Sequence, residues 1–212
     1  MNVIAVSGSY RADGVIDRAM QAAVAGARDA GAHVGELFLR DIHFGHCNNC
    51  RTCWDPAVTG PVGPCPVRDD LTHWLRRIAA ADGLILASPI NVGALTAVFK
   101  QFSERFASLS VLTPAPLWKR WLTGVQAFPT CRVKRRGRTM LWITGSLAPA
   151  LVGRGLMKAP RAQFSGLREL WPARLVDFMW IGGVATADWK LSEKQLHHAR
   201  RAGAAMVRTA SC

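Results

Sequence analysis

Four cysteines fall within nineteen residues of this chain, in a spacing that suits the binding of an inorganic group. They are Cys47, Cys50, Cys53 and, after eleven further residues, Cys65. The first three are two residues apart, so one short loop can turn their thiols toward a common centre. A [4Fe–4S] cluster is bound in this way, because each iron takes one thiolate. The pattern therefore predicts a cluster ligated by these four cysteines.

The same thiols have other interpretations at the level of sequence. Two cysteines separated by two residues can be a redox dithiol, four cysteines can hold structural zinc, and thiols can persist without any metal. The spacer before Cys65 contains three prolines and two glycines. It can form a compact loop at modest cost, because closure entropy rises slowly with loop length. Cys131 and Cys212 lie far away in the sequence and are poorer candidates for a fourth ligand.

The length and composition predict a single domain, residues 1–212, in a reducing compartment. The chain is 50% hydrophobic, which is enough to bury a substantial core. Its first residues lack the basic segment of a secretory signal. The longest charge-free stretch, residues 83–99, contains Pro89 and Asn91 and is short for a membrane span. We expect a cytoplasmic protein without a membrane span, in which disulfides are rare.

The net charge of +13 raises the question of an anionic partner. Nucleic acid is the usual guess for so basic a protein. No helix-turn-helix, zinc-finger or RNA-binding signature accompanies the charge, so we do not expect a nucleic-acid partner. A nicotinamide dinucleotide would be attracted by the same field, and a solvated basic surface is the other interpretation. The densest basic group runs from Arg132 to Arg138.

Short apolar runs alternate with helical patterns along the chain. Strands are predicted at residues 2–7, 33–39, 83–88, 139–144 and 176–182. Helices are predicted from Val15 to Gly31, after Asp69 or Asp70, over 95–106, and after Ser192, where a Ser192-x-x-Gln195 pattern predicts a capping box. Gly203 is expected to weaken the last turns of the final helix. Five strands alternating with helices predict an α/β fold, a three-layer sandwich around a five-stranded parallel sheet.

Two segments interrupt this alternation. Residues 45–67 hold the cysteines and so many prolines and glycines that a long irregular loop is expected. Residues 109–138 contain prolines, tryptophans and the basic group, and we expect an excursion from the domain or an oligomer contact there.

The loops at the carboxyl ends of the strands form the candidate site. Ligands of such folds bind there, where the strand order reverses. The relevant loops are residues 8–14, 88–95, and those from 144 onward. The first has the chemistry of a phosphate cradle: Gly8 permits a tight turn, Ser9 offers a hydroxyl, and Arg11 offers a guanidinium beside the amides of a helix start.

These loops and the cysteines resemble a known family. The matching motifs are Gly8-Ser9-x-Arg11-x-x-Gly14, Leu39-Arg40-Asp41-Ile42, Cys47-x-x-Cys50-x-x-Cys53, Asp69-Asp70, Ala81-Asp82-Gly83-Leu84-Ile85-Leu86-Ala87-Ser88-Pro89 and Lys100-x-Phe102-x-x-Arg105. In type and order they resemble the flavodoxin-like NAD(P)H-dependent FMN reductases, specifically the iron–sulfur flavoproteins. The resemblance extends over the first half of the chain.

The resemblance implies which residues bind the cofactors. It assigns the FMN phosphate to the first loop and the flavin ring and ribityl chain to the loops after the third and fourth strands. The implied residues are Ser9, Arg11, Gly14, Pro89, Ile90, Asn91, Val92, Gly93, Thr144, Gly145 and Ser146. It also implies that the four cysteines of the loop ligate a [4Fe–4S] cluster.

Three positions depart from the family's pattern. Val15-Ile16 replaces an Asn-Thr or Asn-Ser pair, which removes one side-chain contact to the phosphate. Asn91 replaces a tyrosine, so an amide stands where an aromatic edge borders the flavin. The gap between Cys53 and Cys65 is longer than is usual in the family.

The resemblance implies an FMN-dependent oxidoreductase with a [4Fe–4S] cluster. It would pass electrons from NAD(P)H or a ferredoxin-type donor to a small acceptor such as a quinone. No catalytic acid or base is predicted, because the flavin carries the chemistry. One alternative is a non-enzymatic electron carrier or redox sensor that acts through a partner protein. Another is a nucleic-acid binder on a flavodoxin scaffold without flavin. The family and the aromatic-rich residues 109–121 suggest a homodimer or homotetramer.

Overall fold

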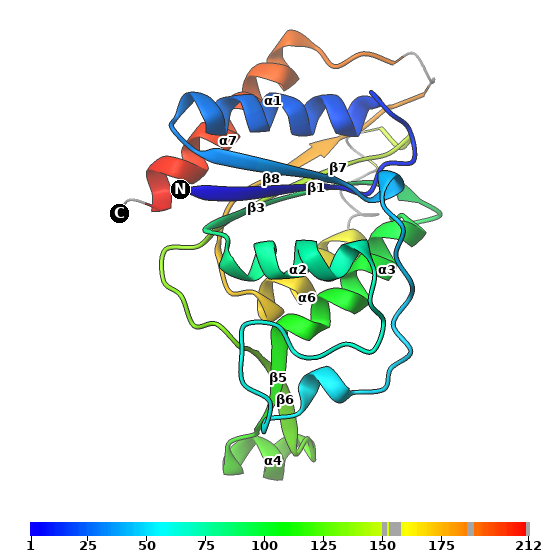
Figure 1. Ribbon diagram of the computed structural model, residues 1–212. Coiled ribbons are helices and arrows are strands. Elements are labelled where there is room, and N and C mark those ends of the chain that lie inside the picture. The colour runs from blue at the N-terminus through cyan, green and yellow to red at the C-terminus, as the bar shows by residue number, and fades with distance from the viewer. Residues whose placement is uncertain (150–151, 153–157, 186–188, 211–212) are drawn as a thin grey trace.

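Five parallel strands form the central sheet, in the order β2-β1-β3-β7-β8 (Figure 1). The computed structural model describes residues 1–149, 152, 158–185 and 189–210. The strands are β1 (Asn2–Ser7), β2 (His33–Phe38), β3 (Gly83–Asn91), β7 (Thr139–Gly145) and β8 (Arg174–Ile181). A two-residue strand, β4 (Ala94–Leu95), pairs antiparallel with the end of β3. The predicted five-stranded parallel sheet is confirmed, and its order is that of flavodoxin.

Helices cover both faces of the sheet and complete three layers (Figure 1). One face carries α1 (Val15–Asp29) and α7 (Glu193–Ala210); the other carries α2 (Asp70–Ala80), α3 (Ala97–Phe106) and α6 (Lys158–Leu170). Val3 and Ala5 of β1 pack toward the first pair of helices. Ile4 and Val6 point to the opposite side and pack toward α2, α3 and α6. The uninterrupted apolar run of β1 is what a sheet covered on both faces requires.

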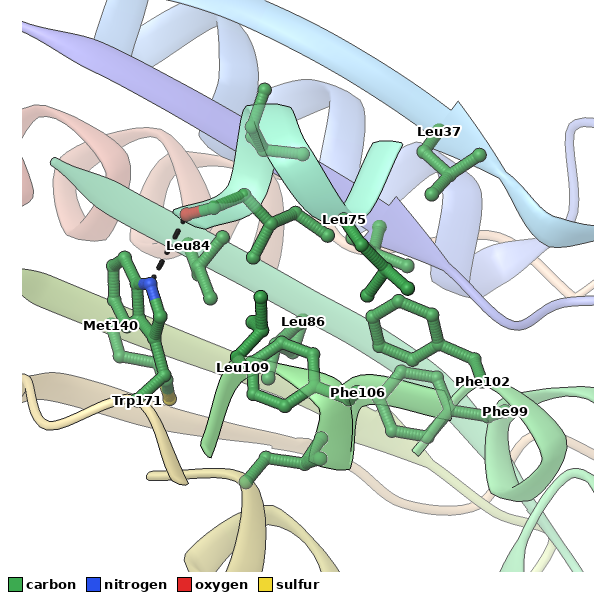
Figure 2. Packing of buried hydrophobic residues seen from close by; sticks show 14 of the residues in the cluster. Leu37, Leu75, Leu84, Leu86, Phe99, Phe102, Phe106, Leu109, Met140 and Trp171 are labelled. Carbon is green, nitrogen blue, oxygen red and sulfur yellow. Dashed lines mark hydrogen bonds between the residues drawn. The ribbon is translucent and has the colours of Figure 1, made fainter. Parts of the chain in front are cut away.

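The core under α2, α3 and α6 is built around three phenylalanines of α3 (Figure 2). Phe99, Phe102 and Phe106 are fully buried, and successive rings lie with their centroids 5.6 Å apart in tilted or edge-on pairs. Such pairs suit the charge distribution of aromatic rings. Trp171 is also buried, and its indole N–H donates to the Ile78 carbonyl at 3.1 Å, the dashed line in Figure 2. This bond satisfies the polar atom that the tryptophan brings into the core.

The strands β2, β7 and β8 differ from their predicted ranges by one or two residues at an end, and the larger differences are at the end of β3 and the start of α3. β3 continues to Asn91, because its last residues pair with β4. Leu95, expected in a helix, lies in β4, and α3 begins at Ala97, with the Thr96 hydroxyl accepting a hydrogen bond from the Phe99 N–H. Helix α6 lies in a part of the chain for which the sequence predicted no element. Within the described ranges, no helix is long and apolar enough to cross a membrane.

Two glycines allow α1 and α7 to touch backbone to backbone. A Cβ at Gly26 would lie 1.9 Å from the Arg200 carbonyl oxygen, and a Cβ at Gly203 would lie 1.9 Å from the Ala23 carbonyl oxygen. The obstructing atoms are backbone, so they cannot move aside as a flexible side chain could. The final helix continues past Gly203 to Ala210, and the absence of a side chain at this glycine permits the close crossing.

Residues 109–138 leave the main sheet and form an arm (Figure 1). β5 (Ser110–Pro114) pairs antiparallel with β6 (Ala127–Cys131), and α4 (Leu117–Thr123) connects them at the tip. Pro114 ends β5 and Pro116 immediately precedes α4, so both prolines stand where a strand gives way to a helix. Proline suits the start of a helix, where its missing N–H has no intrahelical partner.

The buried guanidinium of Arg105 fixes both ends of the cysteine loop, residues 45–67. It donates to the two carboxylate oxygens of Asp69 at 2.6 and 3.1 Å. It also donates to the carbonyls of Gly45 and Val67 at 3.0 and 3.1 Å. Burial acts to raise the pKa of Asp69, but the hydrogen bonds from Arg105 and Gly45 and the charge of Arg105 outweigh it and hold that pKa below its ordinary value. The pair therefore stabilises the fold above the unfolded carboxyl pKa, and this contribution is lost as pH falls through the folded pKa.

Replacing Gly26 with alanine should destabilise the fold by about 3 kcal/mol, because a methyl group there forces α1 away from α7. Gly166→Ala is a matched control in α6, where no atom lies within 4 Å of an added Cβ. That change should stabilise the protein by up to about 1 kcal/mol, since alanine favours helix. Denaturant unfolding measures both variants, and equal stabilities would contradict the backbone contact.

Replacing Arg105 with alanine should destabilise the protein by about 3–5 kcal/mol, the cost of leaving a buried charge unpaired. Residues 45–67 should also become sensitive to proteolysis, because both ends of the loop lose their hydrogen bonds. Lys100→Ala, on the same helix, removes only an exposed ion pair with Glu104 and should cost about 0.5 kcal/mol or less. Similar unfolding and cleavage for the two variants would show that Arg105 does not hold the loop.

Candidate functional site

A cavity of about 360 Å³ opens at the carboxyl edge of the sheet, where the strand order reverses between β1 and β3. Its walls come from the loop after β1, the end of β3, and the residues after β7 and β8. The lining residues are Ser9, Tyr10, Arg11, Gly14, Val15, Ile16, Pro89, Ile90, Asn91, Gly145, Ser146, Leu147 and Val184. The size and position are those of a small-ligand site in a doubly wound sheet.

A wider hollow of about 570 Å³ lies at the opposite edge, beside Asn2, His33 and Ala81. Ligands of this architecture bind at the carboxyl ends of the strands rather than at the amino ends. The guanidinium of Arg28, which lines this hollow, is already paired with Glu36 at 2.7 Å. We therefore assign the candidate site to the smaller cavity.

The structure brings together eight of the eleven residues predicted to bind FMN. Ser9, Arg11, Gly14, Pro89, Ile90, Asn91, Gly145 and Ser146 line the cavity, whereas Val92, Gly93 and Thr144 are absent from its described walls. Val92 and Gly93 form the turn between β3 and β4 with φ of 50° and 77°. Thr144 is buried, and its hydroxyl donates to the Ser88 carbonyl at 2.7 Å. Thr144 thus holds β7 against β3 and lies behind the cavity.

Five further lining residues were not predicted: Tyr10, Val15, Ile16, Leu147 and Val184. The hydroxyl of Tyr10 accepts a hydrogen bond from the Val98 N–H at 3.2 Å, which ties the first loop to the start of α3. Tyr10 stands between two predicted residues, and its aromatic ring was a signal that could have identified it. Val184 follows β8 and reaches the cavity only through the pairing of β8 with β7, so no local pattern points to it.

The start of α1 presents backbone amides to the cavity. Gly14 stands at the N-cap position and offers no side-chain cap, so the first-turn N–H groups keep their capacity for an anion. In the part of the chain that the structure describes, the Arg11 guanidinium makes no hydrogen bond or ion pair. The Ser9 hydroxyl is engaged locally, donating to the Arg11 carbonyl at 3.0 Å and accepting from the Arg11 N–H at 3.2 Å. The amides and Arg11 can therefore bind an anion, and Ser9 shapes the loop.

A buried ion pair between Asp17 and Arg40 holds the loop after β1 in place. The Ser7 hydroxyl donates to Asp17 Oδ1 at 2.6 Å, and a guanidinium nitrogen of Arg40 lies 2.8 Å from Oδ2 without the alignment of a hydrogen bond. Burial raises the pKa of Asp17, opposed by the Ser7 bond and the Arg40 charge. Arg40 also donates to the carbonyls of Ser9 and Arg11 at 3.2 and 3.4 Å. The pair fixes the loop and offsets a carboxylate that would otherwise repel an anion.

The four predicted cluster cysteines lie within reach of one another in the loop between β2 and α2. Burial, and then the neighbouring thiolates of Cys47, Cys65 and Cys50, raise the pKa of the Cys53 thiol. Cys50 is exposed, and a hydrogen bond from the Thr52 hydroxyl lowers the pKa of its thiol. Cys53 therefore lies within electrostatic range of the three other cysteines named from the sequence.

Contacts from other elements hold the long spacer before Cys65. Arg132, at the base of the arm, donates to the Cys53 carbonyl at 2.6 Å. Gly63 donates its N–H to the Ser108 carbonyl at 2.7 Å, and a Cβ on Gly63 would lie 2.1 Å from the Cys53 carbonyl oxygen. The spacer is therefore folded back against Cys53, which explains how a distant Cys65 returns to the other thiols.

The four cysteines of the loop are not arranged around a single ion in the described structure. Among the described residues, no three His, Cys, Asp or Glu side chains are placed to bind a single metal ion. A [4Fe–4S] cluster makes a different demand, because each thiolate binds a different iron and the four sulfurs surround a larger body. The donors fit such a cluster in kind and number, and the Arg105 charge interacts with the thiolates of Cys65 and Cys47.

The two remaining cysteines do not add to this group. The Cys131 thiol donates to the Val133 carbonyl at 3.3 Å and lies 3.7 Å from a guanidinium nitrogen of Arg138. Cys131 therefore belongs to the base of the arm. Cys212 lies outside the described residues.

Solved structures with the same fold include several oxidoreductases. An NAD(P)H:quinone oxidoreductase from Methanothermobacter marburgensis superposes with a TM-score of 0.69 over 96% of both chains, at 17% identity. A flavone reductase superposes with a TM-score of 0.67 over 100% of this chain and 63% of that chain, at 17% identity. A flavodoxin from the domain Archaea superposes with a TM-score of 0.52 over 100% of both chains, at 13% identity. These likenesses show the flavodoxin-like fold.

Sequence similarity identifies the family within this fold to which the chain belongs. The chain is 30% identical over 111 residues to an iron-sulfur flavoprotein of Methanocaldococcus jannaschii, covering 52% of this chain and 54% of the relative. It is 27% identical over 105 residues to an iron-sulfur flavoprotein of Methanosarcina thermophila, covering 50% and 52%. The chain thus spans about half the length of the curated relatives it matches. A family model for NADPH-dependent FMN reductase matches residues 1–127, more than half of the chain. The chain belongs to the NADPH-dependent FMN reductase family.

Proposed function

We propose that this protein is an FMN-dependent oxidoreductase that carries a [4Fe–4S] cluster. It takes electrons from NAD(P)H or a ferredoxin-type donor and passes them to a small acceptor such as a quinone. The observation that carries the proposal is the cavity built from the loops after β1, β3 and β7, in a chain of the NADPH-dependent FMN reductase family. Bound FMN would supply the electron chemistry, and the protein binds and orients it.

The start of α1 would hold the FMN phosphate. Arg11 offers an unpaired cation, and the first-turn amides beyond Gly14 offer donors. The nearest buried acid, Asp17, is balanced by Arg40 at 2.8 Å. This arrangement favours a doubly charged group at the loop more than a neutral one. It would allow a phosphate to bind near this buried carboxylate.

The remaining walls of the cavity would hold the flavin ring and its ribityl chain. Pro89, Ile90 and Gly145 supply apolar and backbone surface, and the Asn91 amide and Ser146 hydroxyl supply hydrogen-bonding groups. Tyr10 adds an aromatic ring, which suits a cavity whose family tyrosine is replaced by Asn91. Val92 and Gly93, on the turn beyond the cavity, and Thr144, behind it, would support these walls.

The net charge and one structural neighbour support the proposed electron donor and acceptor. A net charge of +13 attracts an anionic dinucleotide such as NAD(P)H. One structural neighbour is an NAD(P)H:quinone oxidoreductase, which supports a quinone as the acceptor.

The cysteine loop would hold the cluster through Cys47, Cys50, Cys53 and Cys65. Curated relatives that match the first half of the chain are iron-sulfur flavoproteins, and the charges of Cys47, Cys50 and Cys65 all act to raise the pKa of Cys53, which supports a shared site. The charges of Arg105 and Arg132 lie beside this loop and would offset part of the thiolate charge.

A non-enzymatic electron carrier or redox sensor is the second candidate, favoured by the exposure of Cys50. Reduction of a quinone by NADPH without a partner protein distinguishes the enzyme from the carrier.

A colourless protein that binds DNA with strong salt dependence would support a nucleic-acid binder instead. We place the protein in the cytoplasm and propose a homodimer or homotetramer.

Replacing Arg11 with alanine should weaken FMN binding about 10- to 150-fold, the effect of losing a charge-assisted hydrogen bond. Binding of riboflavin, which lacks the phosphate, should change little. Arg18→Ala, an exposed arginine one turn along α1, is the matched control and should bind both flavins normally. Fluorescence titration of flavin-free protein measures all six affinities. If Arg11→Ala weakened the binding of riboflavin and FMN equally, Arg11 would not be the residue that binds the phosphate.

Protein purified without oxygen should contain about four iron and four sulfide per chain, the content of one [4Fe–4S] cluster. Cys65→Ala should lose or degrade the cluster, because one iron then lacks a protein thiolate. Cys131→Ala is the matched control and should keep it. Flavin-containing wild type that holds no iron even after reconstitution would rule out the cluster and leave an FMN reductase with unused thiols.

A further inference from the structure

The short helix at the tip of the arm turns its apolar face to the solvent. Leu117, Trp118, Trp121 and Leu122 lie on one side of α4, since residues one, four and five positions apart share a helix face. Their exposed fractions are 80%, 66%, 89% and 69%. Large apolar side chains grouped on one exposed surface mark an interaction site.

The polar side of the same helix is used within the arm. Lys119 Nζ lies 3.7 Å from the centre of the Phe128 ring on β6, and Arg120 Nε donates to the Gln126 side chain at 2.9 Å. Gly124 ends the helix with a φ of 69°, and its N–H donates to the Arg120 carbonyl at 2.9 Å. These contacts set the rotation of α4, so its apolar face is held outward rather than left there by a loose helix.

The charge of the chain is concentrated in the segment that contains the arm. The arm, residues 109–138, includes seven Lys and Arg and no Asp or Glu. Some of this charge is balanced, as where Arg135 pairs with Asp82 at 2.6 Å. Lys134 and Arg136 are exposed near the base of the arm. Lys119 and Arg120 are the cations on the tip helix itself, so the apolar side chains stand beside positive charge and no acid of the arm offsets it.

The positive charge and the exposed apolar side chains together indicate which partner the tip of the arm binds. The homodimer or homotetramer proposed above would use another surface, because two copies that met arm to arm would bring two positive segments together, and like charges across an interface oppose association. Nucleic acid is complementary to the positive charge but offers no apolar surface for the exposed leucines to contact. An anionic bilayer matches both, because tryptophans prefer the headgroup level, leucines enter the acyl boundary, and Lys and Arg meet lipid phosphates.

We propose that the tip of the arm, Leu117, Trp118, Lys119, Arg120, Trp121 and Leu122, docks the protein on an anionic lipid surface. Such docking combines apolar insertion with electrostatic attraction, since a single contribution gives only weak, reversible binding. The contact is peripheral, because α4 has seven residues, far fewer than a membrane span requires.

Co-sedimentation with vesicles tests the docking on the full chain. Wild type should bind vesicles that contain phosphatidylglycerol and should not bind pure phosphatidylcholine. Trp118→Ser with Trp121→Ser should weaken binding at least about tenfold, through loss of insertion. Lys119→Glu with Arg120→Glu should weaken it about 25-fold or more, from about fivefold for each cation near an anionic surface. Circular dichroism checks that the variants are folded.

Lys194→Glu with Arg201→Glu is the matched control, because it changes the net charge equally at exposed positions of α7. It should keep vesicle affinity within about threefold of wild type, since α7 is remote from the docking tip in the proposal. Equal losses in the control and arm variants would show a general attraction of a basic protein and overturn the proposal.

A second measurement reads the insertion directly. Brominated lipids quench tryptophans that enter the bilayer, so vesicle-bound wild type should be quenched and Trp118→Phe with Trp121→Phe should bind with the quenching lost. Unchanged quenching in that variant would overturn the proposal. A second result would also overturn the proposal: wild type is an oligomer, and Trp118→Ser with Trp121→Ser is a monomer that still binds vesicles. The tip would then be a contact between copies of the chain.

Discussion

The buried ion pair between Arg105 and Asp69 is the interaction on which the placement of the cysteines depends. A segment with as many prolines and glycines as residues 45–67 cannot hold itself in a helix or strand. Arg105 holds it from outside, by hydrogen bonds to the carbonyls of Gly45 and Val67 at its two ends. Asp69 precedes α2, so one guanidinium links α3, the start of α2 and the loop. Loss of either charge would leave the other buried and unpaired, which makes the whole arrangement cooperative.

At both the cavity and the cysteine loop, arginine side chains offset the negative charge of acidic groups, but they do so through different contacts. At the cavity, a buried carboxylate under an anion site is offset by Arg40, which leaves Arg11 available for a ligand. At the cysteine loop, Arg105 and Arg132 contact backbone carbonyls and bring positive charge beside four thiols. Arginine suits both tasks, because its planar fork can satisfy several oxygens while its charge persists. The positive charge beyond these contacts is gathered in the segment that includes the arm.

The family likeness and the fold extend over different parts of the chain. The family model ends at residue 127, inside the arm. The sheet nevertheless continues through β7 and β8, and structures only 13–17% identical superpose over nearly the whole chain. Packing on a parallel sheet constrains apolarity and volume more than residue identity, so the second half can keep the fold with little sequence likeness.

The sequence by itself determined the elements whose signals are local. The apolar run of β1, the Ser192-x-x-Gln195 start of α7, and the strand-to-loop junctions that hold eight cavity residues each depend on neighbours a few positions away. Tertiary structure decided the rest. Val92 lies on the turn that joins β3 to its partner β4 and is not among the residues that line the cavity, and Gly203 is explained only by the backbone of α1. The roles of Arg105 and Arg132 appear only when carbonyls distant in sequence meet their guanidinium groups. Local patterns specify helices, strands and loop chemistry, whereas these positions depend on partners tens of residues away, which only packing brings together.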